Sequence, residues 1–173
     1  MQNAQETLEG VYDVALGDHA VYVRVHGLAG MTNCLCMRDF LERMLAAGRT
    51  FIVVDLAACT GMDSTFMGVL AGAASYESPG KPVGVAVVNA GPQLVKLLEE
   101  IGLNELLFIE PKPFTMPEVN FVRLEGQPGE EERLQLIKSA HEHLIKVSAN
   151  NERVFGPLVA VLREEMRRRG IGS

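Results

Sequence analysis

The feature that most constrains the fold of this chain is a regular alternation of strand-length apolar runs with helical segments after residue 50. Three apolar runs, at residues 51–58, 81–89 and 106–110, are separated by segments with helix start and stop signals at residues 63–78 and 91–102. Nearly continuous apolar runs are typical of strands that are buried on both faces of a sheet. The pattern therefore predicts an α/β layer architecture.

Two shorter runs that are rich in Val and Tyr, at residues 11–16 and 19–27, precede this alternation. The two-residue gap Gly17-Asp18 between them is typical of a β-hairpin turn. The second run alternates apolar with polar residues, as a half-buried strand does. A helical segment that stops near Gly48 follows. The chain is thus expected to open with a hairpin and a helix.

Composition narrows the classes of partner and compartment. Sixteen Lys and Arg residues against 22 Asp and Glu residues give a formal net charge of -6, and aromatic residues make up only 6% of the chain. An acidic field repels phosphate and few rings can stack on bases, so neither nucleic acid nor an anionic membrane is an expected partner. Three cysteines are too few for a disulfide framework, the N-terminus has no secretory signal, and no apolar run is long enough to span a membrane. We therefore expect a cytoplasmic protein.

The C-terminal third of the chain differs from the rest. Four of the eight prolines lie in residues 111–129, which predicts a connecting segment with little regular structure. The pattern of residues 130–173 predicts two amphipathic helices, and the second is expected to begin at Pro157. We divide the chain into an α/β domain at residues 1–110, the connector, and a helical extension. The two helices should pack on the domain or on a second copy, which could form a homodimer.

No metal or cofactor site is predicted. Cys34 and Cys36 lie two apart on a predicted helix and point to different faces, and no second cluster of ligands completes a site. His141 and His143 diverge for the same reason and are expected to be a surface pair without chemistry. The turn at residues 27–30 has two glycines but lacks the third glycine of a dinucleotide-binding fingerprint.

The segment GMDSTFMG, residues 61–68, is the most informative stretch. A buried strand precedes it, and Asp63 is a good cap for the helix that follows. Ser64 and Thr65 would then lie in the first helical turn, where backbone N–H groups have no partner within the helix. A phosphate on Ser64 would be tolerated there, because it would meet free N–H groups and the positive end of the helix dipole. The alternative is that Ser64 only assists the cap.

The ordered motifs resemble the STAS domains of bacterial anti-sigma factor antagonists over roughly residues 10–110. The family pattern is an apolar strand that ends in Asp-Leu, a short loop, and then Asp-Ser-Ser/Thr-Gly-Leu-Gly. PQLVKLLEEIGLNELLFI resembles the closing helix and last strand of the family. Phe66 stands where the family has its first Gly, and Gly30 stands where many members carry an acid. The matching positions are Asp55-Leu56, Asp63-Ser64-Thr65, Met67 and Gly68.

The resemblance implies a mixed β-sheet covered by helices and a regulator that works by partner switching. Such an antagonist binds an anti-sigma factor that is also a serine kinase, and so releases the sigma factor. Phosphorylation of the Ser after the Asp, here Ser64, breaks the complex, and a phosphatase restores it. The surrounding residues Asp63, Thr65, Phe66 and Gly68 would contact the partner. The protein would not be an enzyme.

Three alternatives remain open at this point. The chain could be a STAS subunit that supports a transporter or signalling assembly without phosphorylation. It could also be an enzyme with Ser64 or Cys59 as nucleophile, a reading that requires a His or Lys within hydrogen-bond reach of Ser64. Phe66 would be either an exposed aromatic anchor for the partner or a part of the core.

Overall fold

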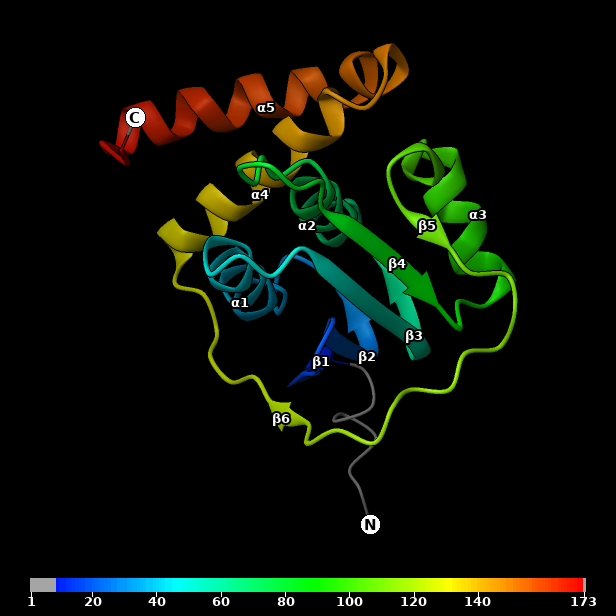
Figure 1. Ribbon diagram of the computed structural model, residues 1–173. Helices are drawn as coiled ribbons and strands as arrows, with labels where there is room; N and C mark the ends of the chain where they lie inside the picture. Colours follow the sequence, from blue (N-terminus) through cyan, green and yellow to red (C-terminus); the bar gives the residue numbers. More distant parts are fainter. Residues whose placement is uncertain (1–8, 173) are drawn as a thin grey trace.

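A six-stranded mixed sheet forms the centre of the computed structural model, which describes residues 9–172 (Figure 1). The strand order is β5-β4-β3-β2-β1-β6. β2 to β5 are parallel neighbours, and β1 runs antiparallel to both β2 and β6. The strands are β1 (Val11–Leu16), β2 (Val21–Ala29), β3 (Phe51–Met62), β4 (Gly84–Val88), β5 (Phe108–Ile109) and β6 (Val122–Arg123).

The first three helices lie on one face of the sheet. Each parallel strand is added on the same side of the one before it, so right-handed crossovers place all three connections on the same face. They are α1 (Leu35–Ala46), α2 (Ser64–Ala74) and α3 (Pro92–Glu100), and a short 3₁₀ turn (Leu103–Glu105) follows α3. This arrangement confirms the predicted α/β class and the mixed sheet covered by helices.

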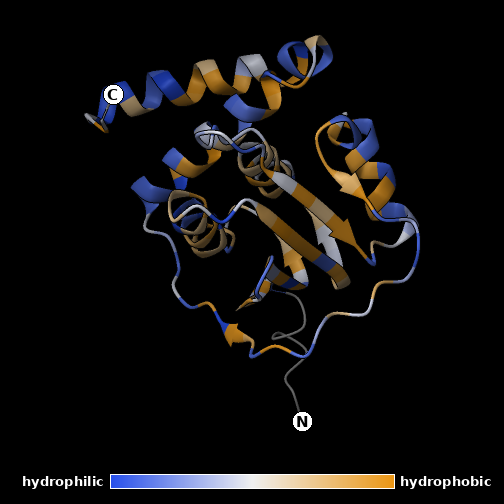
Figure 2. Ribbon diagram, in the orientation of Figure 1, coloured by the Kyte–Doolittle hydropathy of each residue, from blue (hydrophilic) through white to orange (hydrophobic). Residues whose placement is uncertain are grey.

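The main core fills the space between the sheet and these helices. Along β2, Val21, Val23 and Val25 point into this core, and Ile52 and Val54 do the same from β3. Each such side chain contributes about 1.5–3 kcal/mol by leaving water. Figure 2 shows the result, with hydrophobic strands at the centre and an α5 at the periphery that alternates hydrophilic and hydrophobic residues.

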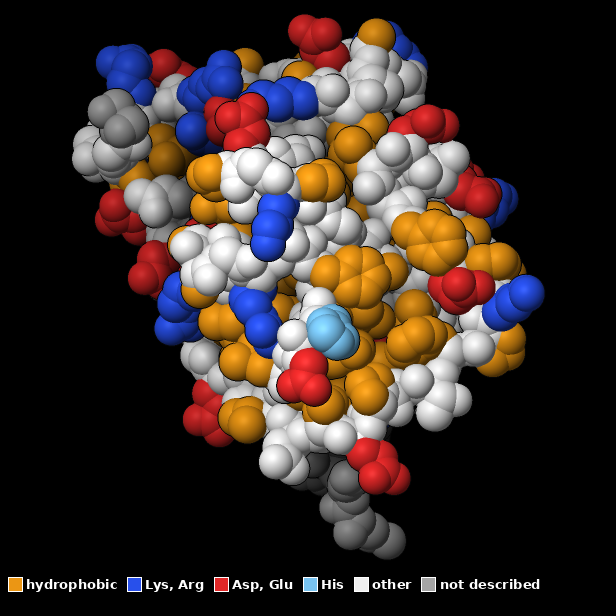
Figure 3. Space-filling model, in the orientation of Figure 1, with side chains coloured by type: hydrophobic (Ala, Val, Ile, Leu, Met, Phe, Trp, Pro, Cys, Tyr) orange, Lys and Arg blue, Asp and Glu red, His pale blue; other side chains and the backbone are white. Residues whose placement is uncertain are grey.

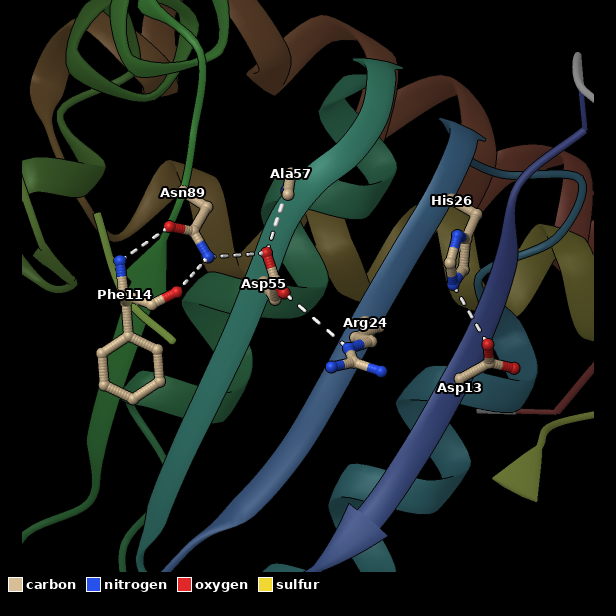
Figure 4. A network of polar contacts seen from close by, with 7 residues as sticks. All are labelled: Asp13, Arg24, His26, Asp55, Ala57, Asn89 and Phe114. Atoms are coloured by element: carbon tan, nitrogen blue, oxygen red, sulfur yellow. Dashed lines mark hydrogen bonds and ion pairs between the residues drawn. The ribbon is translucent and has the colours of Figure 1, made fainter. Parts of the chain in front are cut away.

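The Pro-rich connector crosses the opposite face of the sheet. After β4, the side-chain amide of Asn89 accepts a hydrogen bond from the Phe114 N–H and donates one to its carbonyl, both at 2.9 Å (Figure 4). The Phe121 ring lies 4.0 Å from the Arg24 guanidinium, a cation–π contact over β2. β6 then pairs with β1, where the Arg123 guanidinium donates to Asp13 and lowers the pKa of its carboxyl. The connector thus carries the chain from one edge of the sheet to the other.

A row of polar side chains underlies the connector on this face. The Asp55 carboxylate accepts hydrogen bonds from the Ala57 N–H at 2.9 Å and from the Asn89 amide at 3.1 Å, and Arg24 lies 3.9 Å away (Figure 4). The space-filling view shows hydrophobic side chains gathered at the centre of one face of the molecule (Figure 3). Asp55, part of the Asp-Leu step in the sequence pattern, therefore ties β3 to β2 and to the chain after β4.

The C-terminal helices return to the helical face. α4 (Glu130–Ile145) packs on α2, and α5 (Ala149–Arg169) packs on α4. The buried Asn151 amide joins three helices, because it donates to the last carbonyls of α3 and α4, at Ile101 and Leu144, both at 2.9 Å. The Leu144 carbonyl also accepts from the Val147 N–H at 3.1 Å, and Ile101 is the residue just after the end of α3. Within residues 9–172, none of the helices is both long and apolar enough to cross a bilayer.

Three sequence expectations about element boundaries are wrong. β3 extends to Met62, four residues beyond the apolar run at residues 51–58, because β3 stays paired with β2 as far as Ala29 and Met62, with local irregularities. The strand expected at residues 81–89 is limited to β4. Pro157 lies inside α5, which begins eight residues earlier with Ser148 as its cap. Pro157 and Arg153 are both exposed, so water can hydrate the carbonyl that the proline leaves without a donor.

Candidate functional site

Asp63 organises the start of α2. Its Oδ1 accepts a hydrogen bond from the Phe66 N–H at 3.0 Å, which is the expected cap. Its Oδ2 accepts from the Met31 N–H at 2.9 Å, in the turn after β2. A side chain at Gly30 would begin 2.7 Å from the Asp63 carboxyl carbon, so the absence of a side chain at residue 30 lets the carboxylate reach this turn. One aspartate therefore joins the turn after β2 to the start of α2.

Ser64 is the first residue of α2, and its hydroxyl is already engaged. Ser64 Oγ lies 2.8 Å from Nε2 of His141, which belongs to α4. The other ring nitrogen of His141, Nδ1, lies 2.7 Å from the Ile137 carbonyl and must donate to it. In the neutral imidazole Nε2 is then an acceptor, so the Ser64 hydroxyl donates.

His141 is therefore not part of a surface pair, and that expectation is wrong. Its side chain is only 2% exposed, and the Phe155 ring of α5 covers it at a centroid distance of 5.1 Å. His143 is half-buried against Gly72 of α2. Burial lowers the pKa of the His143 imidazole, and the nearby Lys146 lowers it further. The side chains of both histidines of α4 thus contact α2.

Glycines in α2 let α4 approach closely. A Cβ at Gly68 would begin 2.7 Å from the Cβ of Ala140 and closer still to its carbonyl. A Cβ at Gly72 would begin 2.7 Å from a ring carbon of His143. Ser64, Gly68 and Gly72 are spaced four residues apart and form one stripe along α2. Close approach of α4 explains why a helix so rich in small residues accepts the propensity cost of its glycines.

Phe66 is a core residue, and its interpretation as an exposed anchor is wrong. Its ring has no exposed surface and stacks at 6.4 Å on the Tyr12 ring of β1. Thr65 is also buried. α2 lies between the sheet and α4, so almost all of its residues are covered whichever way they point. In this conformation Asp63 and Ser64 keep partial exposure, whereas Thr65, Phe66 and Gly68 offer no surface to a partner.

Two exposed apolar side chains near Asp63 were not predicted from the sequence. Leu28 is 48% exposed and Met31 is 44% exposed. Both line a shallow hollow that also includes Asp63. The alternation along β2 was a usable signal for Leu28, because its side chain follows Tyr22, Arg24 and His26 in register. Leu28 and Met31 therefore form an exposed apolar surface beside the start of α2.

The Ser64–His141 pair meets the distance that a nucleophile and its base require. The surroundings are those of a structural contact, because the ring is only 2% exposed and is covered by α5. Burial raises the pKa of the Cys59 thiol, which disfavours the reactive thiolate. Within residues 9–172, no group of three or more His, Cys, Asp or Glu residues could hold a metal ion.

The fold and site define a class of protein, a helix-covered mixed sheet with an Asp-capped serine at the start of its central helix. The family model described as "Mlab, STAS domain" matches residues 12–109, more than half of the chain. The chain therefore belongs to the STAS domain family. The match ends before the connector, so α4 and α5 lie outside the family domain.

One solved structure agrees with this assignment at the level of the fold. A crystal structure of an anti-sigma factor antagonist from Mycobacterium paratuberculosis is 20% identical with a TM-score of 0.52, and the match covers 60% of this chain and 87% of that one. The phosphorylated Bacillus cell fate determinant SpoIIAA is 17% identical with a TM-score of 0.46, covering 58% of this chain and 92% of that one. No curated protein matches the chain.

Proposed function

We propose that this protein is a partner-switching regulator of the anti-sigma factor antagonist type, controlled by phosphorylation of Ser64. The observation that carries the proposal is the position of Ser64 directly after Asp63, at the first residue of α2 in a STAS domain. A phosphate there would lie at the positive end of the helix dipole. The partner would be an anti-sigma factor with serine kinase activity, and a phosphatase would reverse the modification.

The protein would act by binding and not as an enzyme. The buried His141 and the raised pKa of the Cys59 thiol support this choice over the nucleophile hypothesis. The free cysteines fit the reducing cytoplasm in which such a regulator would work.

Phosphorylation would act on the complex through charge. A phosphoserine adds up to about two negative charges, which repel acidic groups and are costly to bury in an interface. We expect Ser64→Asp to weaken capture of the native partner and Ser64→Ala to retain capture while abolishing modification. Pull-down from the native cell with mass spectrometry would identify the partner and the phosphosite together. Modification at another residue, or equal capture by Ser64→Asp and the parent, would contradict the proposal.

A second candidate is a STAS subunit that supports a transporter or signalling assembly without phosphorylation. The observation that favours it is the Ser64 hydroxyl, which is occupied by a hydrogen bond to the buried His141. Under this hypothesis native Ser64 stays unmodified in all growth conditions, and the captured partners are subunits of one stable assembly. Phosphoproteomics of the native cell separates the two candidates.

The C-terminal helices could also join two copies. Val154, Leu158 and Val161 form an exposed apolar stripe along α5, at helical spacing. We propose that this stripe forms a homodimer contact. Light scattering should then report twice the chain mass, and Val161→Glu should return the protein to a monomer. A monomeric parent at micromolar concentration would refute this contact.

A further inference from the structure

The helical extension covers the part of α2 that carries the regulatory serine. α4 lies along the stripe of Ser64, Gly68 and Gly72, with Ala140 against Gly68 and His141 bonded to Ser64. Leu136 and Leu144, one turn on either side of Ala140, are fully buried in the same core. α4 therefore occupies this surface as an amphipathic helix in a groove does.

We infer that α4 and α5 form an intramolecular lid that competes with the protein partner for the Ser64 face of α2. The inference rests on the proposed function only for the identity of that face as the binding surface. In the closed form, Ala140 of α4 covers Gly68, so a partner reaches Gly68 only after α4 leaves. The partner that fits is an amphipathic helix with a small residue opposite Gly68 and a hydrogen-bond acceptor opposite Ser64.

The two helices are built to move as one unit. Arg163 bonds to Glu142 at 2.8 Å and Arg169 to Glu130 at 2.6 Å, and both pairs join α5 to α4. Phe155 adds an apolar contact between the same helices. Displacement of the unit from α2 leaves these contacts intact, because none of them involves the α/β domain.

α4 attaches to the domain mainly along α2. A cavity of about 360 Å³ lies between α1, α2 and α4, lined by Leu41, Val69 and Ala140 among others. Close packing is thus missing where α4 passes α1, and α2 is the main support of the lid. Asn151 provides a further tie, to the end of α3. The connector keeps the released lid at high local concentration, so closure is favoured again once a partner leaves.

The closed lid and a phosphorylated Ser64 exclude each other. The Ser64 oxygen lies 2.8 Å from a ring that is only 2% exposed, and phosphorylation replaces the hydroxyl proton that this ring accepts, so the closed form loses the Ser64–His141 hydrogen bond. A kinase therefore modifies only the open form, and the modification in turn disfavours closure, because coupling between two sites is reciprocal. Because only open molecules bind, the apparent affinity of a partner is its intrinsic affinity multiplied by the fraction of open molecules.

A labelled peptide of residues 130–148, which contains α4, tests the lid without any kinase. Ala140→Glu in the full chain should push α4 away from Gly68 while leaving the α2 surface unchanged. Gln135→Glu adds the same charge at an exposed position of the same helix and serves as the matched control. Fluorescence anisotropy should show the peptide binding to Ala140→Glu at least about tenfold more tightly than to the parent or the control. A peptide that itself carries Ala140→Glu should not bind.

His141→Ala provides a milder opening variant in case Ala140→Glu does not fold. Hydrogen exchange on both variants should show faster exchange in α2 and α4 than in the sheet. The lid hypothesis would be refuted if the peptide bound equally to the parent and to a folded opened variant. It would also be refuted if the peptide bound to neither variant. A kinase that leaves Ser64 unmodified would refute the proposed function and leave the peptide result unaffected, so the two failures are distinguishable.

Discussion

Replacement of Gly68 by alanine is the sharpest test of the contact between α2 and α4, because two effects of opposite sign compete. In a helix without tertiary contacts, Gly→Ala gains about 0.8–1 kcal/mol of helix propensity. At residue 68 the new methyl would begin 2.7 Å from the Ala140 Cβ and closer to its carbonyl. Backbone atoms of α4 cannot turn away as a side chain can, so the whole helix must shift.

The cost of that shift is larger than the gain in propensity. Overpacking a filled interface costs about 1–3 kcal/mol. The shift also separates Ser64 from His141, and a buried group left without its hydrogen bond costs about 1–3 kcal/mol. After subtraction of the propensity gain, we expect Gly68→Ala to lower the free energy of unfolding by about 1–5 kcal/mol.

Gly72→Ala is the matched control, one turn later on the same stripe. Its methyl meets the imidazole of His143, a side chain that can rotate, so the steric cost should be smaller. Urea unfolding at neutral pH should therefore rank Gly72→Ala above Gly68→Ala in stability, and hydrogen exchange should place the loss of protection in α2 and α4. A Gly68→Ala variant more stable than the parent would refute close packing of the two helices.

Three further predictions concern buried side chains. Phe66→Ala should cost roughly 3–5 kcal/mol in urea unfolding, because the ring is buried; a loss below about 1 kcal/mol would contradict its place in the core. His143, which faces Glu42, Glu142 and Lys146, has a lowered pKa, so the folded state binds fewer protons than the unfolded state below about pH 6.5. Stability should thus fall from pH 7 toward pH 5, and His143→Gln should flatten that slope; an unchanged slope would refute the assignment. Asn151→Ala removes a donor from the Ile101 and Leu144 carbonyls and should cost about 1–3 kcal/mol by thermal or urea unfolding, against a negligible effect of the exposed Asn150→Ala.

Local sequence signals predicted the α/β domain well because its determinants are local. Apolar runs predicted the parallel strands, and Asp63 predicted the start of α2, since a carboxylate three residues before a free N–H caps a helix in any context. The predictions erred where pairing overrides local preference. β3 continues through residues 59–62 because β2 lies beside it and pairs with it.

The site was predictable only in part. The Asp-Ser-Thr step selected Ser64, and the excess of small residues in α2 signalled a close approach. The sequence did not predict that α4 is the segment that packs on these small residues, because Ser64 and His141 lie 77 residues apart. Phe66 had two interpretations on a helical wheel, and the position of β1 beneath its ring decided between them.

Chain order and local chemistry determine the elements of this protein, the serine at the start of α2 and the glycines along its stripe. Tertiary structure alone decides that α4 reaches that stripe. The connector crosses the opposite face of the sheet and pairs with β1 before α4 begins, and the position of α4 follows from those contacts. A hydrogen bond such as that between Ser64 and His141 forms only when a fold brings both atoms together, and no local periodicity encodes that distance.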